Sequence, residues 1–547
     1  MRVVFVGIGA EQMPLEALSA LAKRDGHQAE LAFDPSLFDD RYHLSVPWLA
    51  RRFDRREATV ARAVALRPDV VAMSVLTNAY QWSLEMAREI KARTGARVIL
   101  GGVHPSAVPE LVIAESAVDA ICVGEGDRAF PAYLAALEAG TLDAAIPNLW
   151  HKHDGRVVRG EQTGFEQDLD ALPFFDKDLY ADEIDVAGLY MTITGRGCPY
   201  RCTFCFNNFW AKLPSRSGAK PGRYVRQRSV DHVIAELRHA KRRYGIRFVD
   251  FEDDVFTVDK RWIQAFLERY RREIGVPWMC LTHPKYVDED IVRWMKEAGC
   301  TWVQIGIQSV DEHYKHASMK RYEKQGDVAW AIDAFMRAGI GVKGDHIFGS
   351  PGEGNEAQRA ALEFYAEHTP ARISTYWMTY YPGVEMTADA LARGLLSEEE
   401  VRRMDHGDVH AFHHTGVVKD PLLLRQLANH EIAFRFLPAV PQRLRKHVRP
   451  EWLSPIPLPL LSALSTAADV AVGFAQQNPE HLAYARHYLT HLYRHARGAA
   501  RVPEVHTAPA AAPSAPAAPL PDPRSDLVPA SRLVRRAGET PGDRAAG

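Results

Sequence analysis

The sequence has little cysteine, almost no net charge and no long apolar run. Six cysteines in 547 residues are too few for a disulfide framework. A net charge of −2 provides no global basic field, and we expect no nucleic acid among the partners. The longest apolar stretch, residues 458–474, is interrupted by serine, threonine and aspartate, whereas a spanning helix needs about 20 apolar residues. We therefore expect a buried helix there and no transmembrane segment.

The first residues also lack an export signal. Residues 3–6 are apolar, but this run is too short for a signal-peptide core of about 7–15 residues. It is typical of a buried first strand. We therefore expect a cytoplasmic protein with reduced thiols.

The composition, with 46% hydrophobic and 25% charged residues, is that of a globular chain. Single hydrophobic cores stop growing at roughly 250–300 residues, so we expect more than one structural unit. In residues 1–145, short apolar runs alternate with amphipathic segments, which predicts an α/β unit with a doubly wound, Rossmann-like parallel sheet. The predicted strands are residues 3–6, 70–74, 97–100 and 120–123.

Small and polar residues follow these predicted strands, at the sheet edge where such folds bind ligands. Glycines there let the backbone approach a large ligand closely. The loop residues that we consider candidates for binding are Gly7, Ser74, Thr77, Gly101, Gly102, His104, Gly124, Glu125 and Gly126. A nicotinamide dinucleotide is disfavoured, because Gln12 replaces the third glycine of the G-x-G-x-x-G pattern. Glycines that serve only as turn residues are the simpler alternative for each loop alone.

The remaining chain divides into four segments. Residues 146–187 have the composition of a linker, and residues 188–396 predict six strand–helix units in series. Six units predict a partial (β/α)6 barrel, which is open because a complete barrel has eight. Residues 397–498 predict a C-terminal helical region, and residues 499–547, rich in Ala and Pro, predict a disordered tail. The predicted barrel strands are residues 190–194, 248–251, 278–281, 302–307, 341–348 and 373–379.

The strongest motif lies directly after the first barrel strand. Cys198, Cys202 and Cys205 have the spacing C-x-x-x-C-x-x-C, and three thiolates on one loop can hold three irons of a [4Fe–4S] cluster. One iron would then remain open for an external ligand. A zinc knuckle is disfavoured because no histidine lies between His153 and His232, and a ferredoxin-like carrier would need a fourth cysteine. The other cysteines lie in apolar runs typical of core thiols: Cys122, Cys280 and Cys300.

This motif resembles that of the radical S-adenosylmethionine (SAM) enzymes. In that family SAM chelates the open iron, and electron transfer into its sulfonium releases a 5′-deoxyadenosyl radical. The resemblance implies a [4Fe–4S] cluster on Cys198, Cys202 and Cys205, SAM as a second cofactor, and an external electron donor of the flavodoxin or ferredoxin type. Phe204 matches the aromatic residue that lies near the adenine.

Later segments resemble the same family in the same order. Residues 251–257 resemble the acidic segment after the second strand, which implies that one of its carboxylates receives the SAM amino group. Residues 305–309 resemble the fourth strand, whose polar end meets the ribose, although Gln308 replaces the usual glutamate. Residues 347–353 resemble the fifth-strand turn beside the adenine. The implied SAM contacts are Phe204, Glu252, Asp253, Asp254, Ser309 and Gly349.

The N-terminal block resembles the cobalamin-binding domain that precedes the radical barrel in one large subgroup. Residues 101–106 and 123–127 carry this resemblance, which implies cobalamin as a third cofactor held by the strand-end loops. Residues 7–13 lack the histidine that coordinates cobalt in many such domains, so cobalt without a lower histidine ligand is implied. His104 lies in another loop, where contact with the cofactor and a bond to backbone remain equal alternatives.

Together these resemblances imply a cobalamin-dependent radical SAM methyltransferase that acts on an unactivated carbon. One SAM would methylate cobalamin, and a second would yield the radical that abstracts hydrogen from the substrate. A radical cyclase or rearrangement enzyme, like the cyclase that forms the fifth ring of bacteriochlorophyll, is the main alternative. A non-catalytic iron–sulfur and cobalamin sensor is the alternative from another class. The sequence assigns no catalytic residue.

The substrate is expected to be a small molecule. Apolar residues of the C-terminal helical region are compatible with a large apolar substrate at the barrel mouth, and also with ordinary helix packing, which we favour. These residues are Trp452, Leu458, Leu460, Leu461 and Phe474.

Overall fold

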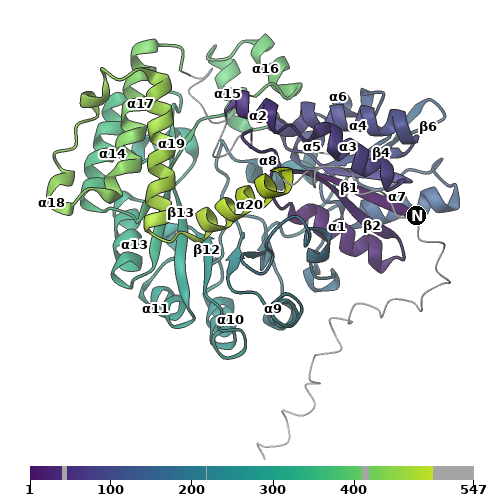
Figure 1. Ribbon diagram of the computed structural model, residues 1–547, viewed down its shortest axis with the longest axis horizontal. Helices are drawn as coiled ribbons and strands as arrows, with labels where there is room; N and C mark the ends of the chain where they lie inside the picture. Colours follow the sequence, from purple (N-terminus) through teal and green to yellow (C-terminus); the bar gives the residue numbers. More distant parts are fainter. Residues whose placement is uncertain (40–45, 217, 410–417, 497–547) are drawn as a thin grey trace, which may run out of the picture.

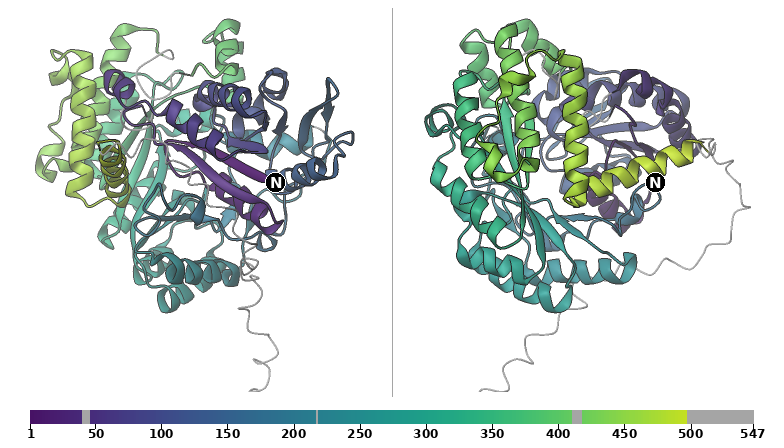
Figure 2. Two further views of the ribbon diagram at one scale, coloured as in Figure 1. Left: turned by 45° about the vertical axis from the view of Figure 1, so that its right-hand side comes forward. Right: turned by 60° about the vertical axis from the view of Figure 1, so that its left-hand side comes forward.

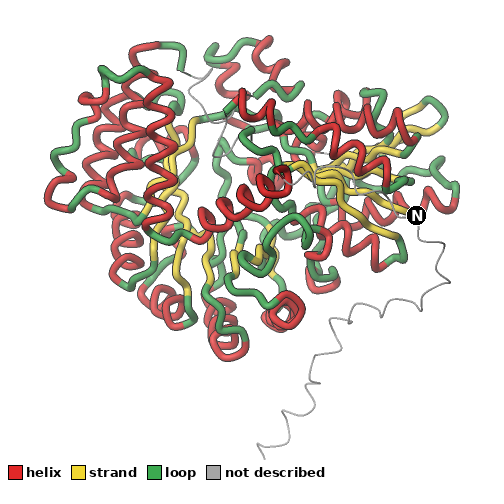
Figure 3. Tube along the Cα trace, in the orientation of Figure 1, coloured by secondary structure: helices red, strands yellow, loops and turns green. Residues whose placement is uncertain are grey.

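The computed structural model describes residues 1–39, 46–216, 218–409 and 418–496. The tail that the sequence predicts at residues 499–547 lies outside these described residues. Two groups of strands, each covered by helices, form the two halves of the molecule (Figure 1, Figure 3). Within the described ranges, no helix combines the length and the apolar character that crossing a bilayer requires.

The first sheet has seven strands in the order β2-β1-β3-β4-β5-β6-β7. Strands β1 to β5 are parallel, and the strand order reverses at β1, which is where doubly wound folds bind ligands. β2 is missing from the sequence prediction, because its first half alternates exposed and half-buried residues at the sheet edge. The strands are β1 (Arg2–Ile8), β2 (Gln28–Asp34), β3 (Val70–Ser74), β4 (Arg97–Gly101), β5 (Ala120–Cys122), β6 (Leu149–His153) and β7 (Arg156–Arg159).

β6 and β7 lie in the segment that the sequence analysis treats as a linker. They form an antiparallel hairpin that continues the first sheet beyond β5. The Arg159 guanidinium lies 4.5 Å from the centre of the Trp150 ring and covers this edge of the hairpin. The first sheet therefore extends to Arg159, not only to residue 145.

Helices cover both faces of the first sheet because its strands are apolar on both sides. Val3 and Phe5 of β1 pack toward α1 and α7, whereas Val4 and Val6 pack toward α3 and α4. The helices of this half are α1 (Met13–Arg24), α2 (Pro47–Arg52), α3 (Arg56–Ala65), α4 (Tyr80–Thr94), α5 (Val103–Ala107), α6 (Pro109–Ala114) and α7 (Gly126–Ala139).

The second sheet has six parallel strands in the order β15-β14-β13-β12-β11-β8. Each strand lies beside its neighbour in the sequence, and in the described part of the chain β8 and β15 do not pair, so the barrel is open. The strands are β8 (Tyr190–Thr192), β11 (Val249–Phe251), β12 (Trp278–Thr282), β13 (Cys300–Gln308), β14 (Gly341–Phe348) and β15 (Arg372–Trp377). A separate antiparallel pair is formed by β9 (Gly195–Arg196) and β10 (Arg226–Gln227).

The barrel helices begin where polar side chains satisfy their first backbone N–H groups. Ser229, Asp259 and Asp288 accept these bonds at the starts of α9, α10 and α11. The apolar faces of the helices then bury the outer faces of the strands. The helices are α8 (Phe206–Arg216), α9 (Val230–Tyr244), α10 (Lys260–Glu273), α11 (Glu289–Glu297), α12 (Glu312–Tyr314), α13 (Gln325–Arg337) and α14 (Asn355–Glu367).

The C-terminal helices join the two halves of the molecule. α20 passes from the barrel to the first sheet (Figure 1, Figure 2). At its start Glu480 accepts hydrogen bonds of 2.7 and 2.9 Å from Lys343 of β14, and further along the Tyr488 hydroxyl accepts one of 3.0 Å from the Phe38 backbone N–H. These helices are α15 (Glu385–Ala392), α16 (Glu398–Asp405), α17 (Pro421–Phe436), α18 (Gln442–Arg445), α19 (Leu458–Ala475) and α20 (Pro479–Ala496).

The expectation of a buried helix at residues 458–474 is wrong for one side of α19. Leu461 is buried against α17, but the side chains of Leu460 and Phe474 are 53% and 44% exposed. Trp452 is 72% exposed. Leu460 and Phe474 face solvent because the opposite side of α19 packs on α17, and Trp452 lies in the short turn before α19.

Candidate active site

The loop that carries the three cysteines is fixed against the barrel by the β9–β10 pair. A Cβ on Gly195 would lie 2.6 Å from the Arg226 carbonyl oxygen, and one on Gly197 would lie 2.3 Å from the Tyr224 carbonyl oxygen. Gly197 also has a φ of +90°. Both positions therefore require glycine. The loop enters α8 directly after Cys205.

The three thiols lie close together in a largely buried region. Cys202 is buried, and Cys198 and Cys205 are half-buried. Burial raises the pKa of Cys198 to about 12 and that of Cys205 to about 11, and it also raises the pKa of Cys202. The neighbouring thiols contribute to the raised pKa of Cys198, which places the three sulfurs within electrostatic reach of one another. The Asn207 backbone N–H donates to Cys205 Sγ at 3.4 Å.

This donor set suits a polynuclear cluster better than a single ion. Thiolates are the metal-binding form, and burial disfavours them until a cation compensates their charge. Among the described residues, no three His, Cys, Asp or Glu side chains converge on a point that could hold one metal ion. Structural zinc needs such convergence, whereas a [4Fe–4S] cluster takes each thiolate on a different iron. The cysteine loop therefore fits a cluster with one iron left for another ligand.

The three carboxylates of the acidic segment after β11 have different partners. Asp253 accepts hydrogen bonds of 2.9 and 3.0 Å from the Thr194 backbone N–H and one of 2.7 Å from its hydroxyl, and burial raises the pKa of Asp253 to about 7. Asp254 accepts a 2.7 Å bond from Asn207 Nδ2 and contributes to the raised pKa values of Cys198 and Cys205. Asp254 is therefore the carboxylate that adjoins the cysteines.

Glu252 lies on the same side of this segment as Asp254. Burial raises the pKa of Glu252, and burial together with the nearby Glu252 also raises the pKa of Asp250 on β11. Glu252 and Asp254 both line the cavity described below, and Asp253 does not. The alternation of side chains along an extended segment explains this division.

The other predicted SAM contacts lie in three different environments. Phe204 packs against an apolar cluster at the barrel mouth. The Ser309 hydroxyl donates to the buried Glu353 carboxylate and accepts a 3.1 Å bond from a backbone N–H. Gly349 has a φ of +72°, and a Cβ there would lie 3.2 Å from the Trp377 ring, so its outer side is covered. Members of the apolar cluster include Tyr314, Met319, Ile347, Met378 and Tyr380.

A cavity of about 490 Å³ separates the edge of the first sheet from the cysteine loop. An inner slot of this cavity runs between β3 to β5 and the helices α1 and α7. Small or apolar side chains line the slot, namely Ala17, Leu18, Ala72, Ile99, Cys122 and Phe130. The sheet-edge residues at its mouth are Ser74, Gly101, Gly102, Gly124, Glu125, Gly126 and Asp127. The barrel contributes Gly195, Arg196, Gly197, Asn207, Glu252 and Asp254 to the opposite wall.

Three residues considered at the sequence level as cobalamin contacts do not line this cavity. Gly7 lies within β1, and a Cβ there would lie 2.7 Å from the Tyr180 hydroxyl, so this end of β1 packs against Tyr180. His104 is fully buried beneath α5, with its ring centre 4.1 Å from that of Tyr80 and its Nδ1 3.3 Å from Thr77 Oγ1. Burial lowers the pKa of His104 to about 3. His104 and Thr77 therefore meet each other in the interior, between the segments that follow β4 and β3.

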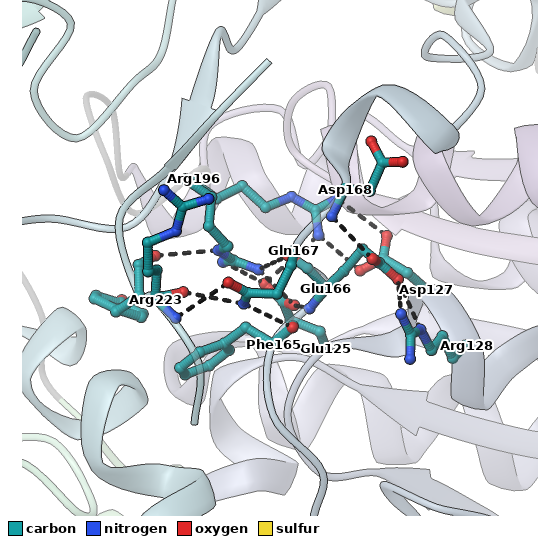
Figure 4. A network of polar contacts seen from close by, with 11 residues as sticks. Glu125, Asp127, Arg128, Phe165, Glu166, Gln167, Asp168, Arg196 and Arg223 are labelled. Atoms are coloured by element: carbon teal, nitrogen blue, oxygen red, sulfur yellow. Dashed lines mark hydrogen bonds and ion pairs between the residues drawn. The ribbon is translucent and has the colours of Figure 1, made fainter. Parts of the chain in front are cut away.

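Two arginines that sequence reasoning missed hold the two walls together (Figure 4). Arg226 of β10 donates to both Glu125 oxygens at 2.7 and 2.9 Å, and Arg196 donates to both Asp127 oxygens at 2.6 and 3.0 Å. Burial would raise the pKa of Asp127, but Arg196 outweighs it and the pKa lies below its usual value. Glu125 therefore serves the contact between the halves. The sequence did contain a signal for this contact: the loop after β5 is acidic, and Arg196 lies two residues before the first cysteine of the motif.

Comparison with protein families matches residues 192–365 to the radical SAM superfamily and residues 10–134 to the B12 binding domain. An uncharacterized methyltransferase of Pyrococcus horikoshii is 27% identical over 402 residues, which cover 71% of this chain and 81% of the relative. An anaerobic magnesium-protoporphyrin IX monomethyl ester cyclase of Rubrivivax gelatinosus is 23% identical over 344 residues, which cover 59% of this chain and 58% of the relative.

Two solved structures share the fold. The radical SAM methyltransferase TsrM of Kitasatospora setae, with tryptophan and a SAM analogue bound, has a TM-score of 0.56 at 18% identity and covers 72% of this chain and 76% of its own. The cobalamin-dependent SAM radical enzyme OxsB, with aqua-cobalamin and SAM bound, has a TM-score of 0.60 at 15% identity and covers 86% of this chain and 71% of its own.

The fold and the two matched domains define a radical SAM enzyme that carries a cobalamin-binding domain. The chain carries a radical SAM domain at residues 192–365, and a B12-binding domain at residues 10–134 precedes it. Its cofactors are a [4Fe–4S] cluster, SAM and cobalamin. The predicted family and fold class are thereby confirmed.

Proposed function

We propose that this enzyme transfers a methyl group to an unactivated carbon of a small molecule. One observation carries the proposal: a single cavity is lined on one side by the sheet edge of the cobalamin domain and on the other by the cysteine loop and its acidic segment. Such a shared cavity brings a methyl carrier and a radical source to the same substrate. The methyltransferase relative, aligned over 71% of this chain, supports the same activity.

The residues of the cysteine loop and the acidic segment have separate roles in this proposal. When bound, the reduced cluster supplies an electron to the sulfonium of SAM, and cobalamin supplies a methyl carrier. Cys198, Cys202 and Cys205 hold the cluster. Asp254 accepts a hydrogen bond from the SAM ammonium group, since it is the cavity-lining carboxylate that adjoins the thiols. Asn207 fixes Asp254 through their 2.7 Å bond.

The cobalamin site in this proposal is the mouth of the slot and the slot itself. Ser74, Gly101 and Gly102 form the mouth, where small side chains leave room for the nucleotide tail. Gly124 and Gly126 border the space for the macrocycle. Among the described residues, no histidine lines this cavity. The cavity lining therefore provides no imidazole that could coordinate cobalt.

The substrate, in this proposal, places an apolar portion at the barrel mouth. The apolar side chains of Tyr, Met and Ile against which Phe204 packs support this placement. The apolar residues of α19 do not. An apolar surrounding also excludes water and so limits side reactions of reactive intermediates.

The proposal includes an external electron donor of the flavodoxin or ferredoxin type and a reducing, cytoplasmic location. Among the described residues, the chain offers one cysteine set suited to a cluster and no second set that could pass an electron to it. The electron must therefore come from a separate one-electron donor. All six cysteines are free thiols, which persist in a reducing compartment.

The cyclase named among the relatives supports a second candidate function, a radical cyclisation without methyl transfer. The two functions differ in their products. A methyltransferase consumes SAM in two ways and forms both S-adenosylhomocysteine and 5′-deoxyadenosine, whereas a cyclase of this type forms only the second.

Anaerobic reconstitution with iron, sulfide and hydroxocobalamin, followed by incubation with SAM and titanium(III) citrate, tests the proposal. We expect bound cobalamin and formation of 5′-deoxyadenosine. Electron paramagnetic resonance of the cob(II)alamin form should lack splitting from an axial nitrogen, and His104→Ala should leave the spectrum unchanged. A protein that takes up no cobalamin would exclude the methyltransferase, and one that forms no 5′-deoxyadenosine would leave the sensor alternative.

A further inference from the structure

The chain around the cysteines is basic in one block. Residues 186–230 contain eight lysines and arginines and no aspartate or glutamate. Four of these cations pair with carboxylates from other segments, namely Arg196 with Asp127, Lys212 with Glu385, Arg226 with Glu125 and Arg228 with Glu236. These pairs position the loop and leave the other four cations to be explained.

The other four cations, here called the basic rim, are Arg201, Arg216, Lys220 and Arg223. All four residues are exposed, and none of them makes an ion pair within the described residues. Four exposed cations without a carboxylate partner among the described residues, close in sequence to the cysteines in a chain of net charge −2, indicate a surface suited to an acidic partner.

The basic rim has a fixed scaffold. Gln167 clamps the loop before β10, because its side chain accepts a 3.1 Å bond from the Arg223 N–H and donates a 3.2 Å bond to the Arg223 carbonyl (Figure 4). The Phe165 N–H donates to the Pro221 carbonyl at 3.1 Å. The part of the rim at residues 221–223 is therefore held in place by the segment that joins the two halves of the molecule.

Short chains of contacts lead from the rim to two of the cysteines. The Arg201 guanidinium donates to the Cys198 carbonyl oxygen at 3.0 Å and lies 5.3 Å from the centre of the Tyr224 ring. The Tyr224 hydroxyl bonds to the Asn207 side chain, whose backbone N–H meets Cys205 Sγ. Tyr224 follows Arg223 directly, so a partner on the rim would lie a few side chains from the thiols.

We propose that the basic rim is the docking surface for a small acidic electron-transfer protein, which delivers one electron at a time. This inference rests on the proposed cluster at Cys198, Cys202 and Cys205. One electron leaves the reduced partner and enters the oxidised cluster, and no bond forms or breaks in the transfer. Such encounters use small, charge-steered interfaces, which the four cations suit.

The test compares two reductants acting on the same holoenzyme. The triple variant Arg216→Glu, Lys220→Glu, Arg223→Glu leaves Arg201 in the cysteine loop untouched. Its 5′-deoxyadenosine formation should fall about tenfold or more when limiting reduced flavodoxin supplies the electrons, because a charge-steered encounter is lost. With titanium(III) citrate, a small reductant that needs no docking surface, the rate should equal that of the unmodified enzyme.

A matched control reverses three exposed cations far from the cysteines in the sequence, Arg261, Arg337 and Arg443, and should leave both rates unchanged. Direct titration with flavodoxin provides a readout without turnover: binding should weaken with added salt in the unmodified protein and be lost in the rim variant. An unchanged flavodoxin-driven rate and affinity in the rim variant would overturn the proposal. So would an equal loss with both reductants, since the residues would then serve the loop fold.

Two further outcomes separate this proposal from others. No 5′-deoxyadenosine from the unmodified protein with titanium(III) citrate would contradict the proposed function, and flavodoxin titration would still decide the docking surface. Oligonucleotide binding that the rim variant loses, with unchanged flavodoxin affinity, would assign the rim to nucleic acid and overturn the proposal.

Discussion

Arg196, two residues before Cys198, forms a bidentate ion pair with Asp127 at the start of α7. The pair is largely buried, with 21% of the arginine side chain and 8% of the aspartate side chain exposed. It joins the sheet edge of the cobalamin domain to the loop that carries the thiols. The distance across the shared cavity therefore depends on one electrostatic contact and the adjacent Arg226–Glu125 pair.

Arg196→Met should destabilise the protein by about 3 kcal/mol, because it leaves the Asp127 carboxylate buried without its partner. The double variant Arg196→Met, Asp127→Leu should recover part of this loss, since no uncompensated charge remains. Urea unfolding of the apoprotein measures both. A double variant less stable than Arg196→Met alone would contradict the account of this pair.

Much of the framework could be predicted because its signals are local. All six barrel strands follow from apolar runs, and the cysteine spacing locates the loop between β8 and α8. The direction of a loop side chain is not a local property. For His104 the sequence leaves contact with the cofactor and a bond to backbone as equal alternatives, and it does not reveal that the ring packs against Tyr80.

Long-range pairing explains the other gaps in the prediction. Glu125 lines the cavity, and the prediction that it contacts a ligand stays a prediction, but nothing in its own segment reveals its ion pair with Arg226, which lies far along the chain. The division of the acidic segment, with Asp253 on Thr194 and Asp254 beside the thiols, likewise depends on neighbours that only the folded chain brings together.

Substituting any one of the three loop cysteines by Ala should abolish the [4Fe–4S] signal and all 5′-deoxyadenosine formation, because each thiolate holds its own iron. Cys122→Ala and Cys300→Ala should keep both, apart from a packing penalty, since these thiols are buried and burial raises their pKa values. Iron analysis with electron paramagnetic resonance measures the first effect. Cleavage of SAM by Cys202→Ala would refute the ligand assignment.

Asp254→Asn should weaken SAM binding by about 10- to 100-fold, which corresponds to the loss of one charge-assisted hydrogen bond. Asp253→Asn should affect SAM binding less, because Asp253 is engaged by Thr194. Equilibrium dialysis of SAM with reconstituted enzyme compares the two variants, with equal iron content as the control. A larger loss in Asp253→Asn would reverse the assignment.

Glu353 gives the fold a defined pH dependence. Burial raises its pKa from 4.5 to about 7. Between these values the unfolded chain releases its proton while the folded protein retains it, so stability falls as pH rises from about 4.5 to 7. The loss is about 3 kcal/mol at most.

Glu353→Gln should remove this contribution and make the pH dependence of unfolding less steep, while its amide oxygen still accepts from Ser309. Urea unfolding at pH 5 and pH 8 measures the difference. The exposed Glu356, in the first turn of the helix that follows Glu353, provides the control, and Glu356→Gln should follow the unmodified protein. Equal slopes for Glu353→Gln and the unmodified protein would show that Glu353 ionises normally in the fold.

The central claim is that one cavity joins a methyl carrier to a radical source. The most direct test is an anaerobic reaction of the cobalamin-loaded and cluster-loaded enzyme with SAM deuterated in its methyl group, a reductant and a small-molecule extract of the source cells. Mass spectrometry should find a product that carries the deuterated methyl group, together with S-adenosylhomocysteine and 5′-deoxyadenosine in equal amounts. Formation of 5′-deoxyadenosine without S-adenosylhomocysteine and without any labelled product would contradict the claim.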